Sequence, residues 1–401
     1  MQPPVFFGGQ RLTPTDLLFP FAAIIYIASL LFGKLKFKWD KFYWVLGGYF
    51  TALLISAIFS VGPGTSFIKL AGETYLMGLG VLTFNLIDNE HDAKWVARAW
   101  LCGSAFAVAI GLLTICVFYL QPENSLLQYT AYHYGAVPVG NYPRISSTFI
   151  SASMFCNYLN VCLVMLFVAE RSGWVGKRSF WILFAAIFIC SIFTISAGLG
   201  GIFLSIGVWA WLLLRFKKAF AGRLALVGGV AIAILFLALN FIALQSYRAA
   251  PYALKLPGVE TELLPSSRLL VWADAVKTFS EDPLTGKGVG QAVSNVIYQN
   301  TDGTYSLLTD AHNIFLNIAA QSGLIGLLAI IALVVYILRQ GRPANTGQSD
   351  GSFILQGLGL AFLSAFVYQG LTGSFEDARH LWVLAGMIPA ARSFQKSDFQ
   401  C

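Results

Sequence analysis

The sequence predicts an all-α, polytopic integral membrane protein, and three observations lead to this fold class. Hydrophobic residues make up 57% of the 401 residues and charged residues only 11%, whereas a soluble domain carries roughly 25% charged residues. The apolar stretches are about 17 to 25 residues long, the length that a helix needs to cross a ~30 Å hydrocarbon layer. Lysine and arginine concentrate on every second connection. A soluble fold is excluded, and so is an outer-membrane barrel, whose strands alternate over roughly 10 residues.

Hydropathy predicts about eleven membrane-spanning helices along the chain. Their approximate bounds are Asp16–Gly33, Tyr43–Val61, Phe67–Ile87, Val96–Leu120, Ile150–Ala169, Phe180–Ser196, Gly200–Leu214, Leu224–Leu244, Asn313–Leu338, Phe353–Leu371 and His380–Ala391. The first span has no preceding basic segment and no small-residue cleavage site, so we do not expect it to be a signal peptide.

The distribution of basic residues predicts the orientation of these spans. Most of the lysines and arginines fall on one set of connections, which the positive-inside rule places in the cytoplasm. The N-terminus is therefore predicted outside and the C-terminus inside. The basic connections contain "KLKFKWDK", Lys94 with Arg98, "RSGWVGKR", "RFKKAFAGR", Arg339 with Arg342, and Arg392 with Lys396.

Two longer connections are then predicted to lie outside, at residues 121–148 and 245–312. The second belongs to a single membrane domain, residues 1–401, as a large helical loop on the outer side. The net charge of +7 is explained by cytoplasmic loops that meet an anionic lipid surface, so no nucleic-acid partner is expected. Five of the six cysteines fall inside predicted spans and Cys401 is the last residue, so no disulfide framework and no metal site are expected.

Within residues 245–312, "SSRLLVWADAVKTF" predicts an amphipathic helix. Ser267 can cap it, and Leu269, Trp272, Ala273 and Val276 follow at helical spacing. We expect this face to lie on the outer membrane surface with Trp272 at the interface and Arg268 in the first turn. The following "EDPLTGKGVG" lacks the GxxxxGK[ST] phosphate-loop pattern. It therefore predicts a flexible turn.

The stretch "DAHNIFLNIAAQSGLIG" places His312 at the outer end of a predicted span. An ionisable side chain at the edge of such a helix is costly unless it has a function. The alternative is a neutral, structural imidazole at a helix start that Asp310 caps. Asn313 can add a hydrogen bond beside the imidazole. Gly323 and Gly326 would allow a neighbouring helix to pack closely and hold the span rigid.

Several cations are predicted at the same outer edge as His312. Arg144, Arg268 and Arg379 lie at span ends or in the long loop, and Lys69 lies four residues before Glu73. Taken singly, each has a structural interpretation: a snorkelling arginine, an interface anchor beside His380, or a mutually neutralising pair. Together, cations around one possible base suit a phosphate-bearing donor that a hydroxyl attacks.

At these residues the sequence resembles the O-antigen ligase and O-antigen polymerase superfamily of bacterial envelopes. "DAHNIFLNIAAQSGLIGLL" is similar to the family's HN-x-x-L…G-x-x-G signature, and "SSRLLVWADAV…DPLTGKGVG" to its R-x-x-x-W…P-x-x-G-x-G stretch. "RISSTFISASMFCNYL" and "RHLWVLAG" match in place and order. The resemblance runs from about Arg144 to the C-terminus and extends weakly to the earlier spans.

The resemblance implies a metal-independent glycosyltransferase of lipopolysaccharide or other polysaccharide biosynthesis, in the bacterial inner membrane. Such enzymes work on the periplasmic side without a cofactor. They join a glycan from undecaprenyl diphosphate to a sugar hydroxyl, which belongs to lipid A–core in ligases and to another lipid-linked glycan in polymerases. His312 would be the general base and Arg268 would bind the diphosphate. Where the family commonly has an arginine this chain has Ala197, so Arg144 or Lys69 would supply the second phosphate contact, or the donor is held differently.

An O-antigen ligase is the first interpretation, and a polymerase for O-antigen or exopolysaccharide is the alternative. The sequence does not separate them, because both need the same donor chemistry, and it does not define the sugar, the acceptor or the oligomeric state. A transporter or flippase for the lipid-linked glycan is a third possibility. Transporters place functional charges near the bilayer midplane, often on broken helices or internal repeats. Here the polar residues lie at the outer edge and the sequence has no evident repeat.

Overall fold

The structure is a computed structural model that describes most of the chain. The described residues are 5–6, 10–11, 14–134, 141–196, 198–214, 219–238, 242–246, 254–255, 261–265, 267–299, 305–342, 350–372 and 378–397. Within them the chain forms thirteen helices and nine short strands. The predicted all-α class is therefore confirmed, and the strands lie in the connections between helices.

The helices follow the predicted spans closely, because each long apolar stretch satisfies its backbone hydrogen bonds internally as a helix. They are α1 (Pro14–Leu31), α2 (Lys41–Ile58), α3 (Pro63–Leu86), α4 (Glu90–Leu120), α5 (Leu127–Thr130), α6 (Ala152–Arg171), α7 (Lys177–Phe193), α8 (Leu199–Leu214), α9 (Ala219–Ala238), α10 (Ser267–Glu281), α11 (Ile314–Gln340), α12 (Asp350–Thr372) and α13 (Arg379–Ser397).

One predicted boundary is wrong. The span predicted to reach Leu244 ends as a helix at Ala238, and Ile242–Ser246 is a strand, β5. This strand pairs with β7 (Thr261–Pro265) in an antiparallel sheet whose other strand is β6 (Leu254–Lys255). β-Branched and long apolar residues suit a strand as well as a membrane helix, so hydropathy alone did not detect the change.

The remaining strands form three antiparallel hairpins. These are β1 (Val5–Phe6) with β2 (Gln10–Arg11), β3 (Ala131–Tyr134) with β4 (Tyr142–Ile145), and β8 (Val296–Gln299) with β9 (Tyr305–Leu308).

Five of the described helices are long and apolar enough to cross a membrane, judged by length and composition: α2, α3, α4, α6 and α11. Shorter apolar stretches lie within α1, α8, α9 and α12. The protein is thus a multi-pass membrane protein by these criteria, and the total of about eleven spans stays a prediction.

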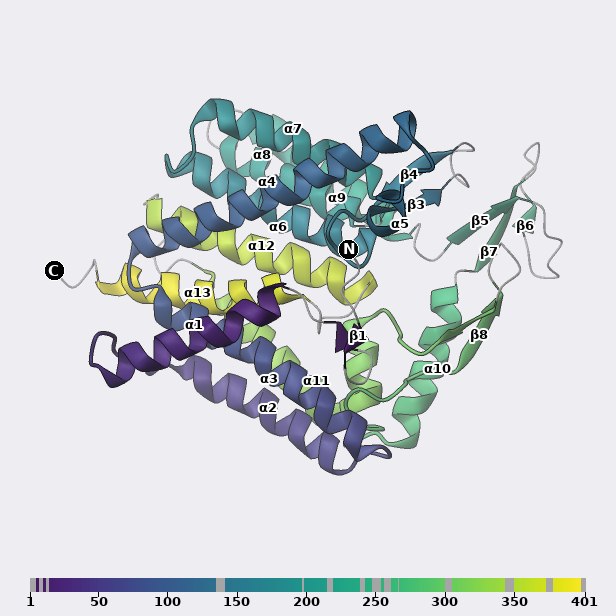
Figure 1. The fold of residues 1–401 in the computed structure, drawn as a ribbon, viewed down its shortest axis with the longest axis horizontal. Helices are drawn as coiled ribbons and strands as arrows, with labels where there is room; N and C mark the ends of the chain where they lie inside the picture. Colours follow the sequence, from purple (N-terminus) through teal and green to yellow (C-terminus); the bar gives the residue numbers. More distant parts are fainter. Residues whose placement is uncertain are drawn as a thin grey trace.

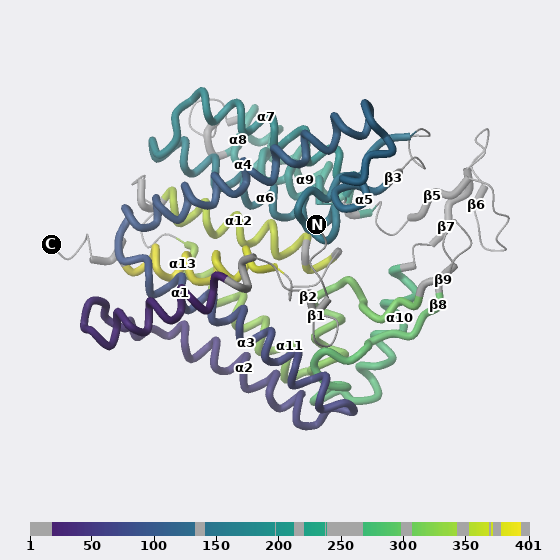
Figure 2. The backbone as a smooth tube through the Cα atoms, in the orientation of Figure 1, coloured from purple at the N-terminus to yellow at the C-terminus, as the bar shows by residue number. Residues whose placement is uncertain are grey.

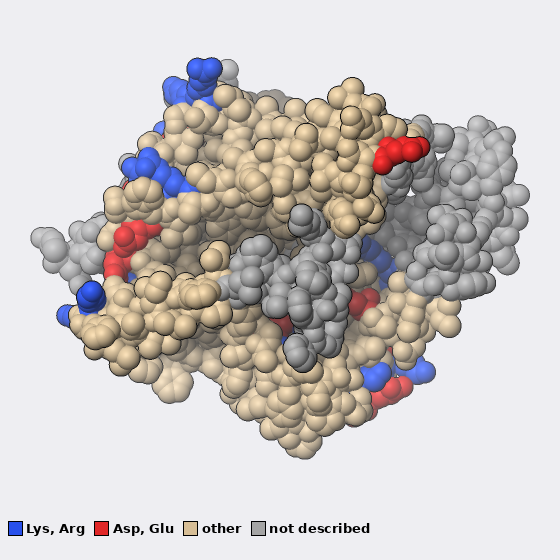
Figure 3. Space-filling model, in the orientation of Figure 1, with Lys and Arg blue, Asp and Glu red and all other residues tan. Residues whose placement is uncertain are grey.

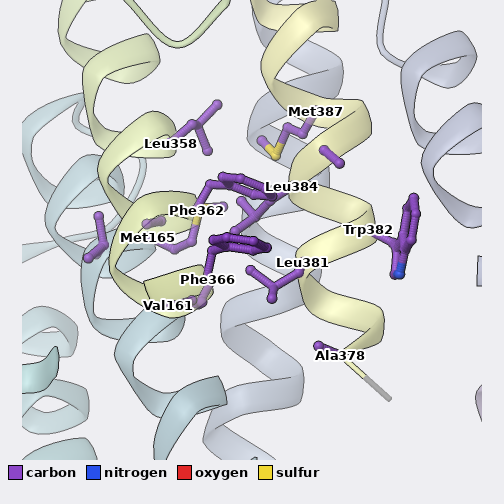
Figure 4. Packing of buried hydrophobic residues seen from close by; sticks show 14 of the residues in the cluster. Val161, Met165, Leu358, Phe362, Phe366, Ala378, Leu381, Trp382, Leu384 and Met387 are labelled. Atoms are coloured by element: carbon purple, nitrogen blue, oxygen red, sulfur yellow. The ribbon is translucent and has the colours of Figure 1, made fainter. Parts of the chain in front are cut away.

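Helix α6 lies at the centre of the bundle, and 83% of its apolar window is buried inside the protein. Val161 and Met165 of α6 face Phe362 and Phe366 of α12, whose rings stack 5.8 Å apart (Figure 4). Leu381 extends the same cluster from α13 (Figure 4). Because α6 contacts protein over most of its surface, the helices packed around it hold the two ends of the bundle at fixed positions relative to each other.

The connections gather at two opposite ends of the bundle. Strands β3 to β9 and helices α5 and α10 lie at one end (Figure 1). At this end Arg144 Nε donates to the Thr194 carbonyl, and Gln291 Nε2 donates to the Gly62 carbonyl. Arg144, Gly62 and Gln291 belong to connections predicted to lie outside, and Thr194 to the outer end of a predicted span.

The opposite end joins the connections predicted to be cytoplasmic. Lys38 pairs with Asp88 at 2.7 Å, Arg98 donates to the Trp174 carbonyl, and Tyr336 donates to Asp40. Several lysine and arginine side chains gather at this end, and mostly uncharged surface covers the helices between the ends (Figure 3). The contacts therefore group the connections in the two sets that the basic residues indicated, while the compartment that each set faces stays a prediction.

We expect cysteine labelling in intact cells to identify the compartments. With the other reactive cysteines replaced by serine, a cysteine at the exposed Asn295 should react with a membrane-impermeant maleimide. A cysteine at the exposed Glu90 should react only after permeabilisation. The opposite labelling pattern would contradict the orientation and the location proposed below for the reaction.

Candidate functional site

Helix α10 packs against the start of α11 and forms a small apolar core there. Its buried members, which we call the satellite core, are Val271, Ala275, Val293, Ala311 and Ala320. Trp272 and Phe279 pack against it. The core fixes α10 and α11 relative to each other at the end of the bundle where His312 lies.

The predicted amphipathic helix is therefore confirmed, but its buried side differs from the expected one. The helix starts at Ser267 itself. Of the predicted apolar face only Trp272 joins the packing, whereas Leu269 is 41% and Val276 51% exposed. Val271 and Ala275, one turn apart, are buried instead because α11 covers them. Contact of the exposed face with lipid stays a prediction.

The segment Asp282–Gln291, which we call the wedge segment, is not the flexible turn that the sequence predicted. Lys287 N donates to the Ala320 carbonyl and Gly288 N to the Gln321 carbonyl, both at 2.9 Å. Leu324 N donates to the Pro283 carbonyl at 2.8 Å. The wedge segment thus pairs with the backbone of α11 (Figure 2).

Gly323 makes this pairing possible. Its backbone leaves the helical conformation, with φ +62° and ψ −164°, and interrupts α11. A methyl group at Gly323 would overlap the Leu284 carbonyl. The expectation that Gly323 and Gly326 admit a neighbouring helix is therefore wrong: Gly323 meets the wedge segment, and the nearest side chain to Gly326 is Ser322 of the same helix.

Two glutamines fix the other side of the wedge segment. Gly290 N donates to Gln321 Oε1 at 3.1 Å, and Gln321 Nε2 donates to the Gln291 carbonyl at 3.0 Å. Gln291 Nε2 reaches the Gly62 carbonyl, at the turn between α2 and α3, at 2.9 Å. Sequence reasoning missed both residues, although a glutamine within an apolar span is a signal that a polar partner lies nearby.

His312 lies in the turn that precedes α11, with its side chain 55% exposed. Its backbone is left-handed, with φ +47°, a conformation that costs free energy for a non-glycine residue and is often found at functional sites. Its backbone N–H donates to Asp310 Oδ1 at 2.5 Å, and its Nδ1 lies 3.6 Å from the same oxygen. The imidazole is thus accessible and lies beside a carboxylate.

The cap of α11 differs from the prediction. Asn313, not Asp310, is the N-cap, and its Oδ1 accepts from Phe315 N at 3.0 Å and from Leu316 N at 3.2 Å. Asp310 lies too early in the chain for this role and instead binds the His312 turn. The predicted hydrogen bond of Asn313 beside the imidazole is thus replaced by a cap.

Two further side chains hold the same turn. Trp272 Nε1 donates to the Ala311 carbonyl at 2.8 Å, which links α10 to the turn. Asn317 Oδ1 accepts from Ala311 N at 3.0 Å, and Asn317 Nδ2 donates to Asp310 Oδ1 at 2.9 Å. Asn317 was missed in the sequence, although it is a polar residue within an otherwise apolar run.

Arg268 and Arg144 come close enough to influence each other. Burial lowers the pKa of Arg268 below its ordinary value, and the positive charge of Arg144 lowers it further. Arg144 itself lies on β4 and is held by its bond to the Thr194 carbonyl at 3.2 Å. Two guanidinium groups near each other favour an anion, because its charge relieves their repulsion.

The other predicted cations occupy separate positions. Lys69 pairs with Glu73 at 3.9 Å, and Glu73 is 2% exposed, so the neutralising pair is confirmed. Lys69 also packs closely against Gly290 of the wedge segment, where an added methyl group would lie 2.7 Å from Lys69 Cβ. Arg379 starts α13. The structure thus places Lys69 beside Glu73 and His312 beside Asp310, and the positive charge of Arg144 acts on Arg268. One cluster of all these cations around His312 stays a prediction.

The sequence predicted neither a metal site nor a disulfide framework. Among the described residues no group of three or more His, Cys, Asp or Glu side chains could hold a metal ion. The cysteines that the structure describes, Cys102, Cys116, Cys156, Cys162 and Cys190, are free. Ala197 lies outside the described residues, so its position in the family pattern has no structural account here.

Comparison with known proteins gives one result. Residues 181–331 match a family model described as O-antigen ligase. The match begins in α7 and ends in α11, so it contains Arg268, the wedge segment and His312, whereas Arg144, Lys69 and Arg379 lie outside it. No curated protein matches the chain.

Proposed function

Because the chain belongs to the O-antigen ligase superfamily through residues 181–331, we propose that it transfers a glycan from undecaprenyl diphosphate to a sugar hydroxyl. The acceptor is lipid A–core, as in a ligase. The reaction takes place at the α10 end of the bundle, on the periplasmic side of the bacterial inner membrane. The proposal needs neither a metal nor a nucleotide, since a diphosphate is already a good leaving group.

The observation that carries the proposal is the exposed imidazole of His312 on a turn built by Asp310, Trp272 and Asn317. Nδ1 faces the Asp310 carboxylate, so Nε2 is the nitrogen that can take a proton from an incoming hydroxyl. The acceptor oxygen then bonds to the anomeric carbon of the glycan. The bond from that carbon to the phosphate oxygen breaks, and its electron pair leaves with undecaprenyl diphosphate.

The leaving diphosphate is assigned to the pair of Arg268 and Arg144. Charge builds up on the phosphate oxygens as the glycosidic bond breaks, and arginine can bind two of these oxygens at once. The lowering of the Arg268 pKa by burial and by the charge of Arg144 supports an anion near Arg268. Lys69, which lies beside Gly290 of the wedge segment, and Arg379 are further candidates for contacts with the donor.

Replacing Arg268 by lysine is expected to lower the transfer rate by about 10- to 100-fold, because the charge stays but the paired hydrogen bonds are lost, at ~1.5–3 kcal/mol for a charged hydrogen bond. The measurement is the initial rate with purified donor and acceptor. Lys277→Arg, on the exposed side of the same helix, is the matched control and should keep the rate. Equal rates for Arg268→Lys and the unaltered protein would remove Arg268 from the diphosphate site.

A polymerase acting on O-antigen or exopolysaccharide is the alternative, since it uses the same donor and the same base. The two are separated by the acceptor. Purified protein in lipid nanodiscs is given undecaprenyl-diphosphate-linked glycan, either with lipid A–core or alone. A ligase forms a glycan–lipid A–core product, whereas a polymerase lengthens the lipid-linked glycan without lipid A–core. Formation of neither product would contradict the proposed transfer.

The interruption of α11 at Gly323 is a feature that favours a transporter, because broken helices often carry substrate sites. In such sites the freed backbone groups line a cavity. Here the Ala320 and Gln321 carbonyls and Leu324 N are bonded to the wedge segment at 2.8 to 2.9 Å. The break is therefore filled by protein, which supports a fixed scaffold and weighs against transport.

A further inference from the structure

Asn317 is a buried polar residue of α11 whose side-chain amide is hydrogen-bonded at both its oxygen and its nitrogen. It is 2% exposed and lies within the first turns of the helix, where its backbone N–H donates to the Asn313 carbonyl at 2.8 Å. Its Oδ1 accepts from Ala311 N, and its Nδ2 donates to Asp310 Oδ1. One side chain therefore reaches back across the turn that carries His312.

Asp310 receives this bond on the same oxygen that faces His312. Its Oδ1 accepts from His312 N and lies 3.6 Å from His312 Nδ1. The Asp310 side chain is 37% exposed, so burial alone does not fix its orientation. The amide of Asn317, which is buried and cannot rotate freely, defines where the carboxylate oxygen lies.

We infer that Asn317 is a positioning residue that acts on His312 through Asp310. The amide holds the carboxylate beside Nδ1, the carboxylate keeps the ring proton on that nitrogen, and Nε2 is left to accept the proton of the acceptor hydroxyl. Which nitrogen of a histidine carries the proton is set by the hydrogen-bond partner of the other nitrogen. This inference rests on the proposed function, in which His312 is the base.

The first test is Asn317→Asp in the purified full-length protein, with undecaprenyl-diphosphate-linked glycan and lipid A–core as probes. Aspartate keeps an acceptor for Ala311 N but loses the donor to Asp310 and sets two carboxylates against each other. We expect kcat to fall by about 10- to 100-fold, the scale of a misplaced catalytic group, with the donor KM unchanged. Asn295→Asp, the same change at an exposed position nearby, is the control and should leave kcat unaltered.

The second test separates the position of the carboxylate from the shape of the turn. In the double variant Asp310→Asn with Asn317→Asp, the amide and the carboxylate exchange places. Asn at 310 can donate to Asp at 317 and still accept from His312 N, so the turn is restored. We expect the melting temperature to recover while kcat stays low, because the charge no longer lies beside the imidazole.

A third variant covers the case in which Asn317→Asp does not fold. Asp310→Asn alone keeps an acceptor for both His312 N and Asn317 Nδ2, so it should fold and should lose transfer. Recovery of kcat in the double variant, or a wild-type kcat in Asn317→Asp or Asp310→Asn, would overturn the inference. If His312→Ala keeps its transfer rate, the proposed function fails instead, and the two failures are thus distinguishable.

Discussion

Replacing His312 by alanine is expected to lower the rate of glycan transfer by about 10²–10⁴-fold, the contribution that general-base catalysis usually makes. The protein should remain folded, because the imidazole is half exposed and its contact with Asp310 is 3.6 Å long. Transfer is measured with purified components, and folding by the melting temperature in the same nanodiscs. A structural histidine would give the opposite result, with a lowered melting temperature and parallel losses of expression and activity.

Glycine at position 312 sharpens this experiment because of the left-handed backbone. Alanine must adopt φ +47° at a cost, whereas glycine adopts it readily, so His312→Gly should be more stable than His312→Ala by about 1–2 kcal/mol. Both variants lack the base. Exogenous imidazole can occupy the space that the missing side chain leaves. It should therefore restore part of the transfer in His312→Gly. Wild-type transfer by either variant without imidazole would falsify the assignment of His312 as the base.

The second large effect is expected at Gly323. A methyl group there would overlap the Leu284 carbonyl, and φ is +62°. Gly323→Ala should therefore separate the wedge segment from α11 and expose the bonded backbone groups, at a cost of several kcal/mol. We expect a strongly lowered melting temperature and little folded protein after purification.

Gly173 provides the matched control for this substitution. Its φ is also positive, +67°, but nothing lies within 4 Å of an added methyl group. Gly173→Ala should cost only the backbone strain, about 1–2 kcal/mol. If both alanine variants melt at the same temperature, the contact between Gly323 and the wedge segment contributes no measurable stability.

The positions of the helices could be predicted from the sequence because a membrane helix is determined by local composition. An apolar run of sufficient length forms a helix in lipid, and a helix lies at each predicted span, although the last residues of the span predicted to reach Leu244 form a strand. At Ile242–Ser246 the same apolar residues form a strand, because pairing with β7 satisfies the backbone there. Such pairing depends on residues that follow later in the chain.

The position of the candidate site could be predicted in part for the same reason. His312 and Arg268 stand out as ionisable residues in apolar surroundings, and the structure places them at one end of the bundle. The residues that hold the wedge segment and the adjoining part of α11 could not be recognised, since their partners are distant in sequence: Gln291 binds Gly62, and Ser56 Oγ donates to the Gln321 carbonyl. The glycines of the wedge segment indicated a flexible turn, yet they serve close contact between backbones.

The wedge segment also has a consequence for the order in which the protein is made. Its hydrogen-bond partners are the turn between α2 and α3, which is synthesised early, and α11, which is synthesised late. A nascent chain that has released α10 but not yet α11 still lacks the Ala320 and Gln321 carbonyls to which Lys287 and Gly288 bind. The part of the protein that carries His312 is therefore completed only after α11 has been inserted into the membrane. Until then, a partly made chain has its helices up to α10 but no assembled site.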